Sequence, residues 1–153
     1  FPGGIETAEM SSTSGFAMVD GHVHFHHGFE ASRFLESAHA NLQDAARRMS
    51  SEVSLVGMLL LTEGKQESGF QRLIAQVEQQ TGRGERSTSF CCNLNNLDKR
   101  KKCFTARDRF PIIVVAGRQI PTQKRLEVLA VGTRREFEEG RPIRVLIQEV
   151  LQL

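Results

Sequence analysis

The 153-residue sequence predicts an α/β domain, and three observations support this class. Strand-like and helix-like patterns alternate through the N-terminal half, which is the order of an α/β fold. The apolar run from Val53 to Leu61 is almost unbroken, as in strands of a parallel sheet that is covered on both faces. Two apolar segments at 110–120 and 126–131 are joined by a short turn, which favours an antiparallel hairpin near residues 110–131.

The same patterns place each element along the chain. Helices are expected where apolar residues recur at three- and four-residue steps, and strands where they alternate or form short runs. A glycine ends the second helix, and Pro142 opens the last one. The expected strands cover about 17–25, 53–61, 88–94, 102–106, 110–120 and 126–131, and the expected helices cover about 33–49, 70–82 and 143–151.

Composition and charge narrow the function classes. Hydrophobic residues make up 39% and charged residues 25%, which is typical of a soluble globular protein. A net charge of +2 gives no general attraction for nucleic acid or for an acidic membrane. The basic run at 98–102 has no interleaved aromatic residue, so we do not expect nucleic-acid binding there. No apolar run is long enough to span a bilayer, and we expect no membrane partner.

Length and cysteine usage predict one domain in a reducing compartment. We expect a single α/β domain at 16–153, preceded by a flexible lead-in at 1–15 whose first nine residues need not belong to the native protein. Adjacent cysteines of a strand point to opposite faces, so a bridge between two of them would be strained. We therefore expect reduced thiols and a cytoplasmic protein. The three cysteines are Cys91, Cys92 and Cys103.

Histidines concentrate at the end of the first strand. Four of the five lie at 22–27, and alternation along the strand would point Asp20, His22, His24 and His26 to one face. Imidazole is the commonest metal ligand of proteins, and a nearby carboxylate often orients it. The pattern predicts a metal site with His22 and His24 as ligands. A solvent-exposed, histidine-rich strand end is the alternative.

Three motifs in chain order resemble the PHP (polymerase and histidinol phosphatase) domain, a family of metal-dependent hydrolases. The segment 20–24, Asp-Gly-His-Val-His, is similar to the Asp-x-His-x-His that opens the family. Thr62-Glu63 stands where the family commonly has Thr-Asp-His, and 117–120, Gly-Arg-Gln-Ile, stands at its Gly-x-Glu-Ile, again followed by a hairpin return. The resemblance covers roughly residues 19–131. Amidohydrolase barrels, which also open with His-x-His, are more loosely similar.

The resemblance implies a distorted βα barrel with metal ions at its carboxyl-terminal mouth, where metal-activated water attacks a phosphoester. It implies a divalent metal, with Zn²⁺ favoured and Mn²⁺ or Fe²⁺ as alternatives. A small phosphorylated or anionic substrate is implied as well. The residues at the matching positions are His22, His24, Glu63 and Gln119 as metal ligands, Asp20 as the carboxylate behind them, and Arg118 as a contact to the anion. Alternation along the strand adds His26 as a further candidate ligand.

Departures from the family pattern support a second hypothesis. No histidine follows Glu63, and Gln119 carries no charge where the family has a bridging glutamate. A full βα barrel takes about 250 residues, so we expect only a partial barrel, incomplete at its C-terminus and inactive by itself. The alternative is a non-catalytic α/β binding or assembly domain with a degenerate metal site. Its open strand edges would be covered by self-association or by a missing C-terminal segment.

Overall fold

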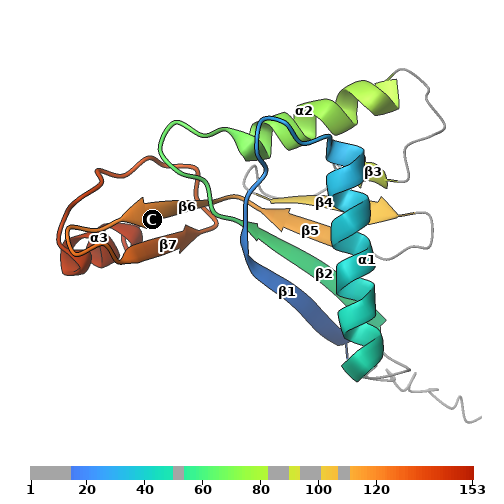
Figure 1. Cartoon of the computed structure of the whole chain (residues 1–153), viewed down its shortest axis with the longest axis horizontal. Coiled ribbons are helices and arrows are strands. Elements are labelled where there is room, and N and C mark those ends of the chain that lie inside the picture. Colours follow the sequence, from blue (N-terminus) through green and yellow to red (C-terminus); the bar gives the residue numbers. More distant parts are fainter. Residues whose placement is uncertain (1–14, 50–53, 83–89, 94–100, 107–110) are drawn as a thin grey trace, which may run out of the picture.

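The computed structural model describes residues 15–49, 54–82, 90–93, 101–106 and 111–153 (Figure 1). The predicted elements are present in the predicted order with bounds shifted by a few residues, except that the strand predicted at 110–120 is divided into β5 and β6. In chain order they are β1 (Gly15–Val23), α1 (Ala31–Met49), β2 (Ser54–Leu61), α2 (Gly69–Gly82), β3 (Phe90–Asn93), β4 (Lys101–Ala106), β5 (Pro111–Val115), β6 (Gly117–Pro121), β7 (Glu127–Val131) and α3 (Ile143–Val150).

Two predicted segments fall largely outside the described residues. Of the lead-in expected at 1–15, only Gly15 is described, and it begins β1. Of the basic run expected at 98–102, Lys101 and Lys102 begin β4, and 98–100 are not described. The flexibility of the lead-in therefore stays a prediction.

The strands form a five-stranded sheet and a separate hairpin. The order in the large sheet is β1-β2-β5-β4-β3, in which β1, β2 and β5 run parallel, β4 is antiparallel to β5, and β3 is antiparallel to β4. β6 pairs with β7 to make the hairpin. The α/β class and the antiparallel hairpin are confirmed. The hairpin is shorter than predicted, because residues 111–115 pair with β2 and β4 in the large sheet and only 117–131 form the hairpin. Both sheets are open over the described strands.

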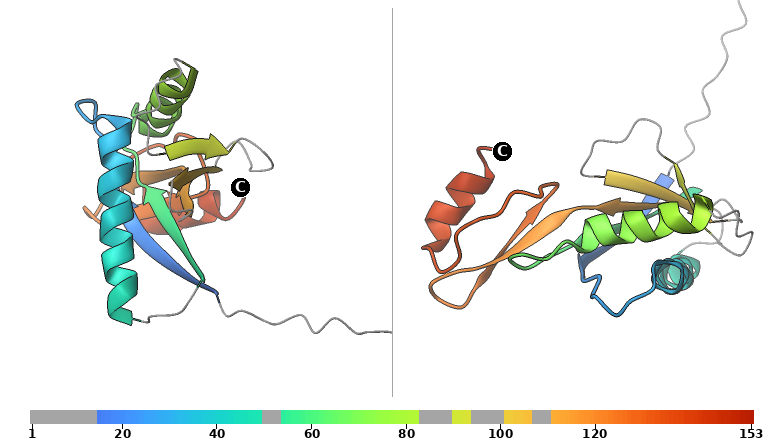
Figure 2. Two further views of the ribbon diagram at one scale, coloured as in Figure 1. Left: turned by 90° about the vertical axis from the view of Figure 1, so that its right-hand side faces the viewer. Right: turned by 90° about the horizontal axis from the view of Figure 1, so that it is seen from above.

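Two helices cover one face of the large sheet. Register places Leu59 of β2 beside Val114 of β5, and both side chains are buried on this face. α1 stands against the sheet (Figure 2), and the buried side chains of both helices join the same apolar cluster. The main cluster contains Phe25, Ala31, Leu35, Leu42, Leu59, Leu61, Phe70, Leu73, Val77, Ile112, Val114 and Ala116.

The opposite face of the parallel strands is apolar but less covered. Val19, Met58 and Ile113 lie side by side across β1, β2 and β5. Val19 is 52% exposed, and Met58, Leu60 and Ile113 are half-buried. We call these four residues the open face. Parallel strands are usually buried on both faces, so this sheet is less covered than is normal for its class.

The hairpin and α3 form a smaller unit with its own apolar cluster. This cluster consists of Ile120, Ala130, Phe137 and Leu146. β6 follows β5 after a single residue, so the hairpin extends the direction of the central strand (Figure 1). Among the described helices, none is both long enough and apolar enough to cross a membrane.

Candidate functional site

The predicted site residues gather where the parallel strands end. His22 and His24 lie at the carboxyl end of β1, Thr62 and Glu63 follow β2, and Arg118 lies just past β5, where it forms an isolated parallel bridge with Glu63. In open α/β sheets, ligands bind outside the carboxyl ends of the strands. The imidazole, carboxylate and guanidinium side chains of the predicted site therefore lie at the edge of the sheet where binding sites normally occur.

A β-bulge in β1 decides which side chains share a face. Asp20 pairs with Leu59 and Val23 pairs with Leu61, so three residues of β1 oppose two of β2. The extra residue reverses the alternation. Asp20 and Val23 therefore both face the helices, whereas His22 and His24 face the other way.

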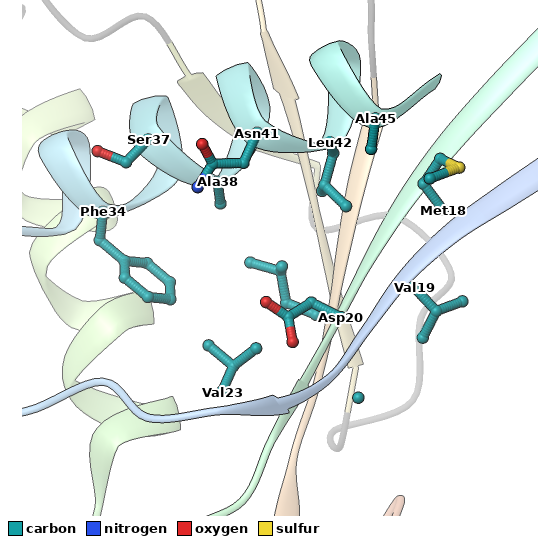
Figure 3. Close-up of a pocket in the computed structure, with 12 residues that line it drawn as sticks. Met18, Val19, Asp20, Val23, Phe34, Ser37, Ala38, Asn41, Leu42 and Ala45 are labelled. Carbon is teal, nitrogen blue, oxygen red and sulfur yellow. The ribbon is translucent and has the colours of Figure 1, made fainter. Parts of the chain in front are cut away.

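The prediction that Asp20 shares a face with the histidines is thus wrong. Its carboxylate lines a groove between β1 and α1, near Ser37 and Asn41 (Figure 3). Its only described link to the histidines is Oδ1, which accepts a hydrogen bond from the backbone N–H of His22 at 3.3 Å. A carboxylate in this position orients the backbone of β1 and does not hold an imidazole ring.

The imidazoles of His22 and His24 converge. Their Nε2 atoms are 3.0 Å apart, and their ring centroids are 5.0 Å apart with a 51° angle between the planes. His26 stacks on His24 at 5.5 Å with nearly parallel planes, and the hydroxyl of Thr62 lies 3.5 Å from His24 Nε2. Three of the histidines therefore form a row beside Thr62, which belongs to the second motif but was not among the predicted ligands.

The distance between the two Nε2 atoms fits a shared metal ion. Zinc–imidazole bonds are about 2.1 Å long, so two nitrogens 3.0 Å apart would subtend about 90° at one ion, which is an octahedral angle. The two rings would have to separate by roughly 0.4 Å to reach the tetrahedral angle that zinc prefers. Without an ion, the same distance is that of a hydrogen bond from the N–H of one ring to the lone pair of the other. The arrangement therefore suits both a neutral pair and a two-nitrogen metal site.

Glu63 lies in a buried ion pair. The residue is 4% exposed, its Oε1 accepts the backbone N–H of Phe70, and its Oε2 lies 3.4 Å from Arg118 Nη1. Burial raises the pKa of the Glu63 carboxyl, and the hydrogen bond from Phe70 and the charge of Arg118 oppose that rise. Glu63 therefore uses both of its oxygens in contacts within the protein.

Arg118 is equally engaged. Its side chain is buried, and Nη1 donates to the carbonyl oxygens of Gly64 at 3.2 Å and Glu67 at 3.0 Å. Nη2 donates to the carbonyl oxygen of Arg134 at 3.0 Å. The guanidinium thus ties the end of β2 to the hairpin unit. This is a structural role, and it leaves the predicted contact with an anionic substrate without support from the geometry.

Gln119 also has a partner within the protein. Its Nε2 donates to Oε1 of Glu127 on the neighbouring strand β7 at 2.7 Å. Its Oε1 is buried and accepts no hydrogen bond from the described residues. The amide is thus held by the hairpin and is not among the groups that contact the imidazoles.

The donor set fits one ion and does not fit a cluster of ions. Over the described ranges, no group of three or more histidine, cysteine, aspartate or glutamate side chains is arranged to hold a metal. Two imidazoles can bind one divalent cation, with water or a substrate completing the coordination. Bridging two cations would require a carboxylate, which this part of the structure does not bring to the imidazoles.

We compared the chain with protein-family models, with curated proteins and with solved structures, and none of the three comparisons gave a match.

Proposed function

We propose that this chain is a metal-dependent hydrolase-like domain that binds one divalent cation through His22 and His24 and acts on phosphoesters or related anions. The observation that carries the proposal is the convergence of two Nε2 atoms, 3.0 Å apart, at the carboxyl ends of parallel strands. The PHP-like order of motifs at 20–24 and 117–120 supports the hydrolase class.

Each residue of the site has a distinct task in this proposal. His22 and His24 hold the ion through Nε2, and the stacked ring of His26 fixes the orientation of His24. Zn²⁺ suits a pair of imidazoles best, with Mn²⁺ and Fe²⁺ as alternatives. A bound divalent ion lowers the pKa of a coordinated water and polarises a phosphoryl oxygen. Arg118 contributes by fixing the end of β2, where Thr62 lies beside His24.

The open face supports a partial barrel as the setting for this site. In a closed βα barrel, one face of the parallel strands fills the interior with branched apolar side chains. Val19, Met58 and Ile113 form an apolar row of this kind across three parallel strands. We propose that β1, β2 and β5 form the parallel part of a partial barrel, in which β4 pairs with the far side of β5 and the outer side of β1 is unpaired among the described strands.

Isothermal titration with Zn²⁺ tests the metal site. We expect one-site binding by the tag-free chain and at least a roughly tenfold weaker affinity for His22→Ala/His24→Ala, because each imidazole supplies one metal bond. The matched control is His27→Ala/His39→Ala, which also removes two histidines but leaves the converging pair. Equal, weak binding by all three proteins would contradict the proposed metal site.

A second candidate function is a non-catalytic binding or assembly domain. The saturation of Glu63 by Phe70 and Arg118 favours it, because this carboxylate is then not free to act as a third metal ligand or as a base. Zinc binding without measurable hydrolysis of p-nitrophenyl phosphate would support this candidate over the enzyme. Turnover that depends on His22 and His24 would support the enzyme.

A further inference from the structure

β1 is an edge strand with one unpaired side. It lies first in the order of the five-stranded sheet, and it pairs with β2 along Gly15 to Asp20 and again at Val23. None of the described strands pairs with its other side. We call this side the β1 edge. Unpaired backbone N–H and C=O groups along a strand are a template on which another strand can add.

The β1 edge lacks the features that usually prevent such pairing. Natural edge strands are protected by proline, by lysine, by strong bulges or by being short. β1 contains no proline, lysine or arginine, and its bulge lies only at the carboxyl end. Phe16 is 55% exposed and Val19 is 52% exposed, and Asp20 is the one acidic residue of the strand. The edge is therefore long, apolar and accessible over most of its length.

An apolar groove runs beside the strand. It has a volume of about 440 Å³ and lies between β1 and α1 (Figure 3). Met18 and Val23 line it from the strand, and Phe34 and Leu42 line it from the helix. Of the described residues that line the groove, Asp20 alone carries a charge. A strand added at the β1 edge would place alternate side chains over this groove.

We propose that the β1 edge pairs with the β1 edge of a second copy of this chain, antiparallel about a two-fold axis. A second copy offers the same apolar edge, and an axis through Met18 pairs Met18 with Met18 and Ala17 with Val19. Asp20 then lies opposite Phe16 of the other copy, and the two carboxylates do not face each other. Apolar cross-strand pairs at the centre of the interface would stabilise the shared sheet. The proposal uses none of the histidines and does not depend on the metal site.

The size of the interface determines how tightly the copies associate. A nine-residue strand is about 30 Å long, and covering it over the roughly 10 Å depth of a sheet buries on the order of 300 Å² per copy. A stable dimer usually buries about 800 Å² per partner. We therefore infer a concentration-dependent dimer and not a permanent one.

Sedimentation equilibrium of the whole chain tests the proposal. We expect the average mass to rise from 17.1 kDa toward twice that value between about 1 and about 200 µM, the range of a small interface. Phe16→Lys/Val19→Lys should raise the dissociation constant at least about tenfold, because lysine protects edge strands. The control is Leu126→Lys, which alters an equally exposed side chain (56%) in the turn of the hairpin and should leave the constant unchanged.

Hydrogen exchange supplies a second readout that needs no variant. In the wild-type chain, the amides of 15–23 should exchange more slowly as the concentration rises, because pairing protects them. A constant monomer mass over the whole range would overturn the proposal. So would a concentration-dependent mass with exchange at 15–23 unchanged, or an equal loss of association in Leu126→Lys, because the copies would then meet through another surface.

Discussion

Two polar groups lie at the same end of the parallel sheet and differ in how much of their bonding capacity the protein uses. In the first, His22 and His26 are exposed, and the two Nε2 atoms of His22 and His24 face each other. In the second, Glu63 and Arg118 are buried and contact the backbone of several segments. Position at the carboxyl ends of strands is thus shared, whereas accessibility is not.

The contrast distinguishes a candidate binding site, the imidazole pair, from a structural element, the buried ion pair of Glu63 and Arg118. A side chain that is to hold a ligand needs lone pairs or protons that the folded protein leaves available. The imidazole pair has them, because its described contacts are mainly between the rings themselves. The ion pair has few lone pairs or protons available, because buried charges need partners within the protein to offset the loss of water. The sequence resemblance put both groups into one site, and the structure shows that they differ in burial and in contacts.

Removing the buried ion pair of Glu63 and Arg118 should have the largest effect on stability. Arg118→Ala leaves the carboxylate of Glu63 buried without its cation, which should lower the free energy of unfolding by about 3–5 kcal/mol. Urea denaturation followed by far-UV circular dichroism measures this, because the chain has no Trp or Tyr. Arg33→Ala, which removes an exposed ion pair with Glu30, should cost less than about 1 kcal/mol. A similar cost for both variants would mean that the buried pair is not structural.

Adding a side chain at Gly117, next to the buried ion pair, should have an intermediate effect on stability. A Cβ atom at Gly117 would lie 2.5 Å from the carbonyl oxygen of Leu61 and 3.0 Å from that of Ala130, both in backbone that cannot easily yield. Gly117→Ala should therefore lower the free energy of unfolding by about 1–3 kcal/mol. The control lies in the other region: a Cβ atom at Gly21 would meet no described atom within 4 Å, and Gly21→Ala should change stability by less than about 0.5 kcal/mol. The opposite ranking of these variants in urea denaturation would contradict the comparison.

The smallest effect is expected at Asp20. Its carboxylate faces the groove beside α1, so Asp20→Asn should change the zinc affinity less than about twofold, whereas a carboxylate that orients a ligating histidine contributes about 10–100-fold. Zinc titration of this variant beside the wild type measures the difference. A tenfold loss would show that Asp20 does reach an imidazole, and that the faces of β1 are not arranged as described.

The order of elements was predictable because it follows from hydrophobic periodicity. The almost unbroken run at 53–61 correctly predicted β2 as a strand of a parallel sheet, although one face of that sheet is less covered than the run suggested. The row of His22, His24 and His26 followed from simple alternation. These predictions depend on local pattern alone, which a single sequence contains.

The errors have a different physical origin. Alternation cannot reveal where a strand takes up an extra residue, so the reversal after Asp20 was not predicted. Nor can it show that residues 111–115 pair with β2 and β4, since pairing partners come from distant parts of the chain. The pairing of Glu63 with Arg118, 55 positions apart, is a tertiary contact of the same kind.

The bulge makes the identity of each surface depend on residue count as much as on residue type. Removing the extra residue at 21 would restore regular alternation, and Asp20 and Val23 would still both face the helices, because they would then be two positions apart. Phe25 would stay in the interior, and the imidazoles would keep the opposite face. A single-codon deletion at 21 should therefore be tolerated better than a deletion elsewhere in β1, which would move the side chains on one side of it to the other face.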